Sequence, residues 1–188
     1  MLVLSEQLTG TPVMSLQTGT QIAQTRDAII DPSNLGIAAC YVDGPNLEPQ
    51  PTVLFTDDIR ESGELGFIVD DSSKLMALDG LVRLQQLIDQ KFKLVGMSVV
   101  DRRGTKLGKV EDYSFDPDSF MIQQLFVKPS FLQSLTQGSR IVHRSQIIDV
   151  TPHLITIGTA EITETMQERA EEASSFVNPF RSPGQETH

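Results

Sequence analysis

The stretch "GTKLGKVEDYSFDP" (residues 104–117) combines a glycine turn, a strand of alternating character and an Asp-Pro turn. The stretch "GTQIAQTRDAIIDP" (residues 19–32) repeats this pattern, with five of the fourteen positions identical. The identical pairs are Gly19 and Gly104, Thr20 and Thr105, Asp27 and Asp112, Asp31 and Asp116, and Pro32 and Pro117. We therefore expect the chain to contain two copies of one strand unit.

The repeat extends on both sides of this stretch. "LTGTPV" (8–13) matches "LVGMSV" (94–99), "LGIAACYV" (35–42) matches "FMIQQLFV" (120–127), and "TVLFTDDI" (52–59) matches "RIVHRSQI" (140–147) in pattern. Short apolar runs separated by turn residues at this spacing are typical of an all-β barrel or sandwich. About six strands in roughly 70 residues are enough to close a small barrel, and closure removes the exposed edges of an open sheet.

Two local features of the repeat have structural explanations. Gly108 interrupts the alternation of its strand, which predicts a β-bulge, whereas the first copy has Ala23 at that place. Asp31 and Asp116 precede prolines, and we expect both carboxylates to cap turns. A calcium site at Asp116 would need further oxygen ligands that its surroundings do not offer.

Two segments have helical rather than strand spacing. In "SSKLMALDGLVRLQQLIDQ" (72–90), apolar residues recur on one side, and we predict a connecting helix with a break near Asp79-Gly80. The segment "TETMQERAEEASSFV" (163–177) has small apolar residues on one face and glutamates elsewhere. It predicts a C-terminal helix over 161–177, followed by a flexible tail over 178–188.

The run "LVGMSVVDRRGTKLGKVEDYSFDP" (94–117) with the later "RSQIIDVTPHLITI" (144–157) resembles the PRC-barrel domain. This small β-barrel is shared by the H subunit of photosynthetic reaction centres and the ribosome maturation factor RimM. The resemblance covers 92–158 almost throughout and 6–70 more loosely, because "IAQTRDA" (22–28) lacks the Gly-Lys-Val-Glu core of the pattern. It implies a non-enzymatic module that contacts other proteins.

The expected fold is therefore mainly β, with two small PRC-type β-barrels in tandem. The first barrel is predicted over 5–71, the connecting helix over 72–90, the second barrel over 91–160, the C-terminal helix over 161–177 and the tail over 178–188.

Charge is divided unevenly along the chain, whose formal net charge is −10. Residues 1–90 carry 13 acidic against 4 basic side chains, residues 91–160 carry 6 against 9, and residues 161–188 carry 6 against 2. The acidic total argues against a protein that covers its whole surface with nucleic acid. The contrast reflects either solvated surfaces with mutual attraction between the halves or a separate partner for the second half.

No pattern in the sequence indicates catalysis. His143, His153 and His188 follow no metal-ligand spacing with Cys40 or with each other, and the phosphate-binding and nucleophile-elbow motifs do not occur. Cys40 has no partner for a disulfide within the chain and lies in an apolar run, so we expect a buried thiol. We expect a non-enzyme without cofactor or metal.

Two surfaces are candidates for partner binding. Arg102, Arg103, Lys106 and Lys109 crowd into one turn and strand, where they form either a solvated hairpin tip or an anion contact for nucleic acid. In "KPSFLQSLTQGS" (128–139), Phe131, Leu132 and Leu135 have one-turn spacing and either cap the barrel end or face a protein partner. Arg140 and Arg144 would supply the polar rim of that interface.

The sequence thus favours a protein-interaction adaptor or assembly factor. Its alternatives are an RNA-processing or ribosome-maturation factor acting through the basic second half, and a peripheral regulator of a photosynthetic membrane complex. No apolar run approaches the roughly 20 residues of a membrane span, and the N-terminus lacks a secretory pattern. We therefore predict a cytoplasmic protein.

Overall fold

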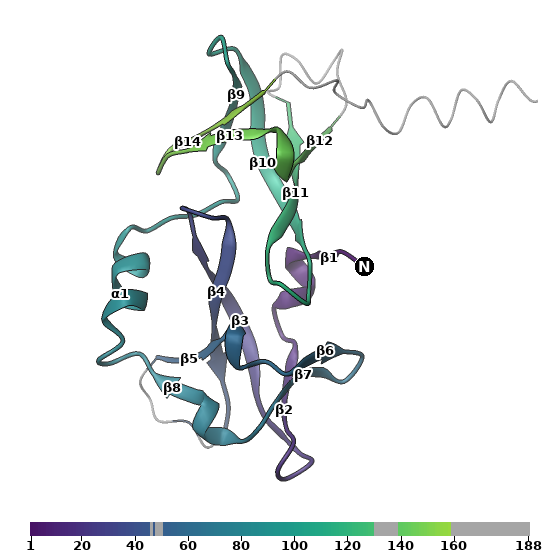
Figure 1. Cartoon of the computed structure of the whole chain (residues 1–188), viewed down its shortest axis with the longest axis vertical. Helices are drawn as coiled ribbons and strands as arrows, with labels where there is room; N and C mark the ends of the chain where they lie inside the picture. The colour runs from purple at the N-terminus through teal and green to yellow at the C-terminus, as the bar shows by residue number, and fades with distance from the viewer. Residues whose placement is uncertain (46, 48–50, 130–138, 159–188) are drawn as a thin grey trace, which may run out of the picture.

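The computed structural model describes residues 1–45, 47, 51–129 and 139–158, which form two seven-stranded sheets (Figure 1). The first sheet has the order β6 (Glu61–Gly63), β7 (Gly66–Val69), β2 (Pro12–Ser15), β3 (Gln21–Asp31), β4 (Gly36–Asp43), β5 (Thr52–Phe55), β8 (Leu75–Ala77). The second has the order β12 (Arg140–His143), β11 (Ile122–Lys128), β10 (Lys106–Phe115), β9 (Ser98–Asp101), β14 (Leu154–Ile157), β13 (Ile147–Val150), and β1 (Val3–Leu4) pairs with β10. The fold is mainly β, as predicted.

The two sheets repeat one strand order. Strands β2 to β7 occupy the places that β9 to β14 occupy in the second sheet. In each sheet the first strand of the copy pairs in parallel with the last strand, β2 with β7 and β9 with β14. All other strand pairs within each copy are antiparallel. The duplication that the sequence predicts therefore recurs in the topology.

Irregularities of register fall at matching places as well. An extra residue, Ile22 in β3 and Leu107 in β10, interrupts the pairing with the preceding strand. Two further shifts lie between Thr25 and Ala28 and between Ile29 and Ile30 in the first copy, and between Val110 and Asp112 and between Ser114 and Phe115 in the second. Because a bulge bends a strand at a defined point, these matched shifts give the two sheets the same local curvature.

The bulge that the sequence predicts around Gly108 is confirmed. Gly108 has a φ of +149°, and a Cβ atom there would lie 2.1 Å from the carbonyl oxygen of Lys128. Ala23, at the matching place, is not among the residues with positive φ. The first copy thus keeps the register shift without the backbone conformation that favours glycine.

Turn residues of the two copies also behave alike. Asp31 accepts hydrogen bonds from the backbone amide (2.8 Å) and hydroxyl (2.6 Å) of Ser33. Asp116 accepts one from the hydroxyl of Ser119 at 2.6 Å. The predicted capping role of both aspartates is confirmed.

Both halves contribute to the largest cluster of the hydrophobic core. The cluster has eighteen buried residues. Those of the first half are Leu8, Leu35, Ile37, Cys40 and Phe67, and they pack with residues of the second half such as Phe115, Phe120 and Leu125. The ring of Phe67 meets that of Phe120 edge-on at 5.5 Å, and Phe115 stacks on Phe120 at 5.9 Å. The two halves are therefore packed against each other rather than independent.

The expected closure of each half into its own barrel is not confirmed. Among the described residues, both strand paths end in unpaired edges, at β6 and β8 in the first sheet and at β12 and β13 in the second. These edge strands have three or four residues each, which limits the hydrogen-bonding edge that they expose. Leu35, Ile37 and Phe67 of the first half pack against the second half, whereas Val13, Ala23, Val42, Leu54 and Val69 form a separate cluster within the first half.

The halves meet through equivalent residues. The amide of Ile37 donates to the carbonyl of Phe120 at 2.9 Å, and the amide of Ile122 donates to the carbonyl of Leu35 at 3.0 Å. In the alignment of the copies, Leu35 corresponds to Phe120 and Ile37 to Ile122. Such an exchange of equivalent bonds is the pattern of an isologous contact, here within one chain.

The turns at this contact share a backbone conformation. Leu35 and Phe120 both have positive φ, at +50° and +54°, and Gly36 forms an isolated bridge with Met121. Figure 1 shows the consequence: the β2–β3 and β9–β10 hairpins lie at opposite ends of the molecule, while the β3–β4 and β10–β11 hairpins overlap at its middle.

The predicted helix over 72–90 is wrong in its first half. Ser72–Lys74 form a 3₁₀ turn (η3), Leu75–Ala77 form β8, and the helix α1 spans only Val82–Asp89. Asp71 accepts a hydrogen bond from the amide of Ser73, which caps the short turn, and β8 then pairs with β5. Tertiary pairing at the sheet edge thus prevails over the helical spacing of the leucines.

Helix α1 covers the first sheet through Leu84, which packs with Ile29, Ala39 and Val53. Val82, the first residue of the helix, is 68% exposed although it is apolar. In the part of the chain that the structure describes, no helix is long and apolar enough to cross a membrane. The predicted C-terminal helix (161–177) and tail (178–188) lie outside the described residues.

The predicted burial of Cys40 is confirmed. Its side chain has no solvent exposure, and burial raises the pKa of the thiol from 9.0 to about 12. We expect the folded protein to react at least a hundredfold more slowly with a thiol reagent than the urea-unfolded chain, because the thiolate is the nucleophile. Ellman's reagent at about pH 8 measures both rates, and comparable rates would contradict this expectation.

Candidate interaction surfaces

A groove beside α1 joins both halves of the molecule. Its volume is about 660 Å³, and it lies between the end of α1, strand β3 and the segment that leads from α1 to β9. Apolar and aromatic side chains dominate its lining, which includes Tyr41, Leu87, Ile88, Phe92, Val95 and Tyr113. Grooves of this size and character are common binding sites for ligands and for amphipathic segments of partners.

Charges stand at the rim of this α1 groove. Lys91, Lys93 and Asp27 line it together with the apolar residues. Val95 is 50% exposed although its neighbour Leu94 is buried, so an apolar side chain is presented to solvent inside the groove. The sequence patterns did not identify this surface, because its residues come from segments that are far apart in the chain and Val95 reads as part of a strand run.

Arg144 lies at a second, more polar groove of about 1050 Å³. Its Nη1 donates to the carbonyl oxygen of Ile122 at 3.2 Å, and its Nη2 donates to that of Asn34 at 2.6 Å. The guanidinium therefore links the two halves. Within the interface predicted from the sequence, Arg144 has this internal role, Arg140 is half-buried on β12, and Phe131, Leu132 and Leu135 lie outside the described residues.

Replacing Arg144 with alanine is expected to lower the free energy of unfolding by about 2 kcal/mol, because two hydrogen bonds from a charged group are lost. Arg102→Ala, at an exposed position, should change it by no more than about 0.5 kcal/mol. Urea denaturation of both variants measures the difference. Equal effects would show that these two hydrogen bonds add no stability.

The basic hairpin, defined as Arg102–Lys109, joins β9 to β10 at one end of the molecule (Figure 1). The four predicted anion-contact residues, Arg102, Arg103, Lys106 and Lys109, are all exposed there. Asp101 fixes the turn, because its carboxylate accepts hydrogen bonds from the amides of Arg103 and Thr105, both at 2.8 Å. The structure thus brings these cations together on a well-defined turn.

The turn has a measurable acid sensitivity. The hydrogen bond from the amide of Thr105, followed by that from Arg103, lowers the pKa of Asp101 below its ordinary value of 3.8. Its contribution to stability is therefore present above pH 3.8 and is lost as the pH falls through the lower folded-state pKa. We expect Asp101→Asn to be less stable than the wild type at neutral pH and to lose less stability in acid. Urea midpoints from about pH 6 to about pH 2 test this, and parallel curves would contradict it.

Apart from β1, the second sheet consists of the six strands β9 to β14. Strand β10 contains a bulge, and the basic hairpin connects it to β9. Residues 91–158 match the PRC-barrel domain family. The PRC-barrel domain therefore coincides with the second copy of the repeat, close to the predicted 91–160. A search of curated proteins gave no match for the chain.

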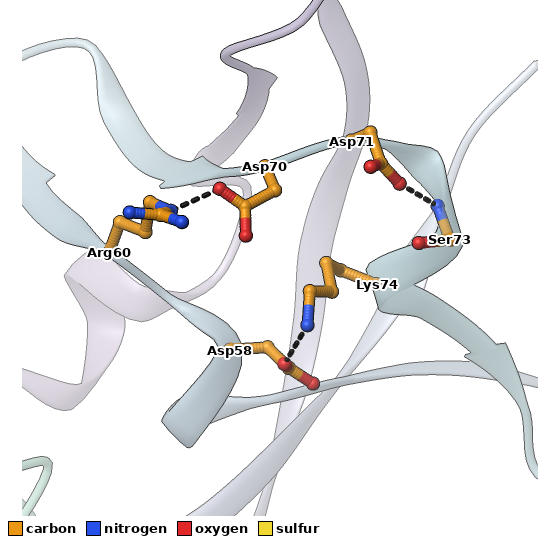
Figure 2. Close-up of polar contacts among 6 residues, drawn as sticks. All are labelled: Asp58, Arg60, Asp70, Asp71, Ser73 and Lys74. Atoms are coloured by element: carbon orange, nitrogen blue, oxygen red, sulfur yellow. Dashed lines mark hydrogen bonds and ion pairs between the residues drawn. The ribbon is translucent and has the colours of Figure 1, made fainter.

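Outside the PRC-barrel domain, the acidic first half forms local ion pairs. Figure 2 shows Arg60 paired with Asp70, Lys74 paired with Asp58 at 2.6 Å, and Asp71 accepting from the amide of Ser73 at 2.7 Å. The side-chain hydrogen bond to Asp70 raises the pKa of Arg60, and that to Asp58 raises the pKa of Lys74. These contacts stabilise the turns around β7.

No metal centre emerges from the acidic residues. Among residues 1–45, 47, 51–129 and 139–158, no group of three or more His, Cys, Asp or Glu side chains could hold a metal ion. His143 and His153 are exposed side chains of the PRC-barrel domain. The carboxylates of Figure 2 are better explained as ion-pair partners and turn caps.

Proposed function

We propose that the protein is a non-catalytic adaptor or assembly factor that binds a protein partner in the α1 groove. The single observation that carries this proposal is the groove itself, which both halves and the connecting helix line with apolar side chains. PRC-barrel domains often mediate protein interactions, and residues 91–158 match this family. On this proposal the protein works in the cytoplasm and needs no cofactor.

The first half would then be a second PRC-type β-barrel unit. It has the strand order and the three register shifts of the PRC-barrel domain. Two such units packed through equivalent turns create a surface that one unit cannot offer. The α1 groove uses residues of both, so the duplication would serve to build the partner site.

Val95→Asp tests the proposal, because it places a charge among apolar groove residues at a position that is already half exposed. The matched control is Leu65→Asp, at a side chain that is 68% exposed and is not among the groove residues. Crosslinking with mass spectrometry on the native complex should show a partner that contacts the groove in the wild type and the control. That partner should be lost with Val95→Asp, and its retention would refute the groove as the binding site.

The basic hairpin supports a second candidate, an RNA-processing or ribosome-maturation factor. Arg102, Arg103 and Lys109 are exposed cations on one turn and strand, which is the electrostatic requirement for phosphate contact. Sedimentation of tagged protein from a lysate separates the candidates: the second predicts association with a ribosomal subunit, and the first predicts another soluble complex. Replacing the three cations with glutamine should abolish ribosomal association and its salt dependence, but leave binding in the α1 groove intact.

A further inference from the structure

Strand β1 shows how the second half accepts an added strand. It pairs antiparallel with β10, and two residues of each strand lie across from each other: Val3 from Phe115 and Leu4 from Ser114. In the alignment of the two copies, Ile30 corresponds to Phe115 and Ile29 to Ser114. The first half therefore contains the equivalent of the edge that holds β1.

This equivalent edge of β3 carries no strand in the described part of the chain. Strand β2 pairs with β3 only as far as Gln24, and two backbone hydrogen bonds at Thr25 complete that contact. From Arg26 to Ile30, β3 has a described strand only on its β4 side. The backbone groups of such an open edge are a template for another strand.

Helix α1 explains why the chain leaves the edge of β3 open. Counting back from the matched residues 8 and 94, the equivalents of the two β1 residues are Asp89 and Gln90, at the end of α1. The amide of Gln90 donates to the carbonyl of Leu87 at 3.2 Å, so it is engaged within the helix end. Lys91 then has a φ of +50° as the chain leaves the helix. A helix end thus stands where the second half has a strand.

The open edge of β3 is also a wall of the α1 groove, which residues 27–30 line. Ile30 packs against the cluster that both halves share, as Val3 of β1 does, whereas Ile29 packs with Leu84 of α1. Directly opposite residues of an antiparallel pair point to the same face, and successive residues of a strand alternate between faces. A strand added to this edge would therefore place one side chain on each of these apolar surfaces.

Positive charge at the rim of the α1 groove is available to an occupant. Lys91 and Lys93 line the groove, and neither forms an ion pair with a carboxylate of the described residues. The carboxylate of Asp27 lies 3.4 Å from Nε of Arg26, so it already has a partner. Complementary charge on the occupant is therefore acidic.

We propose that the α1 groove takes an extended segment of the protein partner, which adds to β3 as β1 adds to β10. This inference rests on the proposed function and specifies its partner. Two adjacent apolar residues of the segment lie across from Ile30 and Ile29, and an acidic residue near them meets Lys91 or Lys93. Backbone hydrogen bonds to β3 supply affinity, and the apolar side chains supply specificity. A helical segment would leave the open edge of β3 unpaired.

Peptide selection tests which pattern the groove prefers. A library of random linear peptides is selected against the full chain, and peptides that also bind the Val95→Asp variant are discarded. We expect enrichment of two neighbouring apolar residues with an acidic residue close by. Enrichment of apolar residues at helical spacing would overturn the inference but keep the groove as the partner site. If no selected peptide depends on Val95, both the inference and the proposed function fail.

Backbone contacts show the bound form directly. In a complex of the isotope-labelled full chain with a selected peptide, we expect nuclear Overhauser effects between backbone protons of the peptide and those of residues 28–30. Their order should be that of an antiparallel pair, and the peptide should have the chemical shifts of an extended chain. Helical shifts with contacts only to groove side chains would overturn the added strand and leave the proposed function standing.

Charge reversal tests the acidic part of the pattern. Lys91→Glu together with Lys93→Glu should weaken binding of a selected acidic peptide by about tenfold or more, because two attractive charges become repulsive. The matched control is Arg102→Glu with Arg103→Glu, which changes the net charge equally at residues that do not line the groove. The control should weaken binding by no more than about twofold, since distant charges are screened. Equal losses would overturn the contact with Lys91 and Lys93.

Discussion

Gly108→Ala is expected to destabilise the protein by about 3 kcal/mol or more. The new Cβ atom would lie 2.1 Å from the carbonyl oxygen of Lys128, and the backbone φ of +149° is unfavourable for any L side chain. Neither problem can be relieved by rotating a side chain, because the colliding atom belongs to the backbone of β11. The register of β10 against both of its neighbours would have to change.

The matched control is Gly104→Ala in the same hairpin. Gly104 also has a positive φ, +81°, but nothing lies within 4 Å of a Cβ atom there. Gly104→Ala should lower the free energy of unfolding by about 1 kcal/mol, because only backbone strain is added. Urea denaturation of both variants measures the free energy of unfolding. Equal losses would mean that the close approach of the Lys128 carbonyl does not limit the choice of residue at position 108.

Phe120→Ala is expected to lower the free energy of unfolding by about 3–5 kcal/mol. The Phe120 side chain is 5% exposed and contacts both Phe67 of the first half and Phe115 of the second. Its removal leaves a cavity where the two halves meet. Residue 120 has a positive φ, and alanine carries a Cβ atom as phenylalanine does, so the substitution is expected to report on side-chain packing rather than on backbone strain.

Phe126→Ala is the control for this variant, because Phe126 is half-buried on the neighbouring strand and lies outside the shared core. Phe126→Ala should lower the free energy of unfolding clearly less than Phe120→Ala does. The wild type should unfold in one transition seen by both calorimetry and circular dichroism, since the halves share the largest cluster of the core. Two separate transitions in the wild type would contradict the packing of the halves into one cooperative unit.

Local sequence patterns predicted local structure well. The matched Gly, Asp and Pro positions of the two copies predicted turns and strands, and Gly108 predicted the bulge in β10. These features depend on backbone conformations that particular residue types favour within a few positions of the chain. The same applies to the buried Cys40, whose apolar neighbours in β4 already indicate an interior strand.

Patterns that depend on distant partners were less informative. The leucines of 72–81 have helical spacing, yet Leu75–Ala77 pair with β5 because a sheet edge is available there. Arg144 looked like a rim residue for an external partner, and only the packing of the halves brings the carbonyl oxygen of Asn34 within its reach. The α1 groove likewise has no continuous signature in the sequence.

The amino-acid sequence by itself determined the duplicated strand unit, its turns and its bulge, because hydrophobic alternation and the conformational limits of Gly and Pro act over short distances. Only the tertiary structure decided that the halves share a cluster of the hydrophobic core, that the sheet paths stay open, and that Arg144 reaches the carbonyl oxygen of Asn34 in the other half. Those outcomes depend on which apolar faces cover each other, and that is set by contacts between residues far apart in the chain.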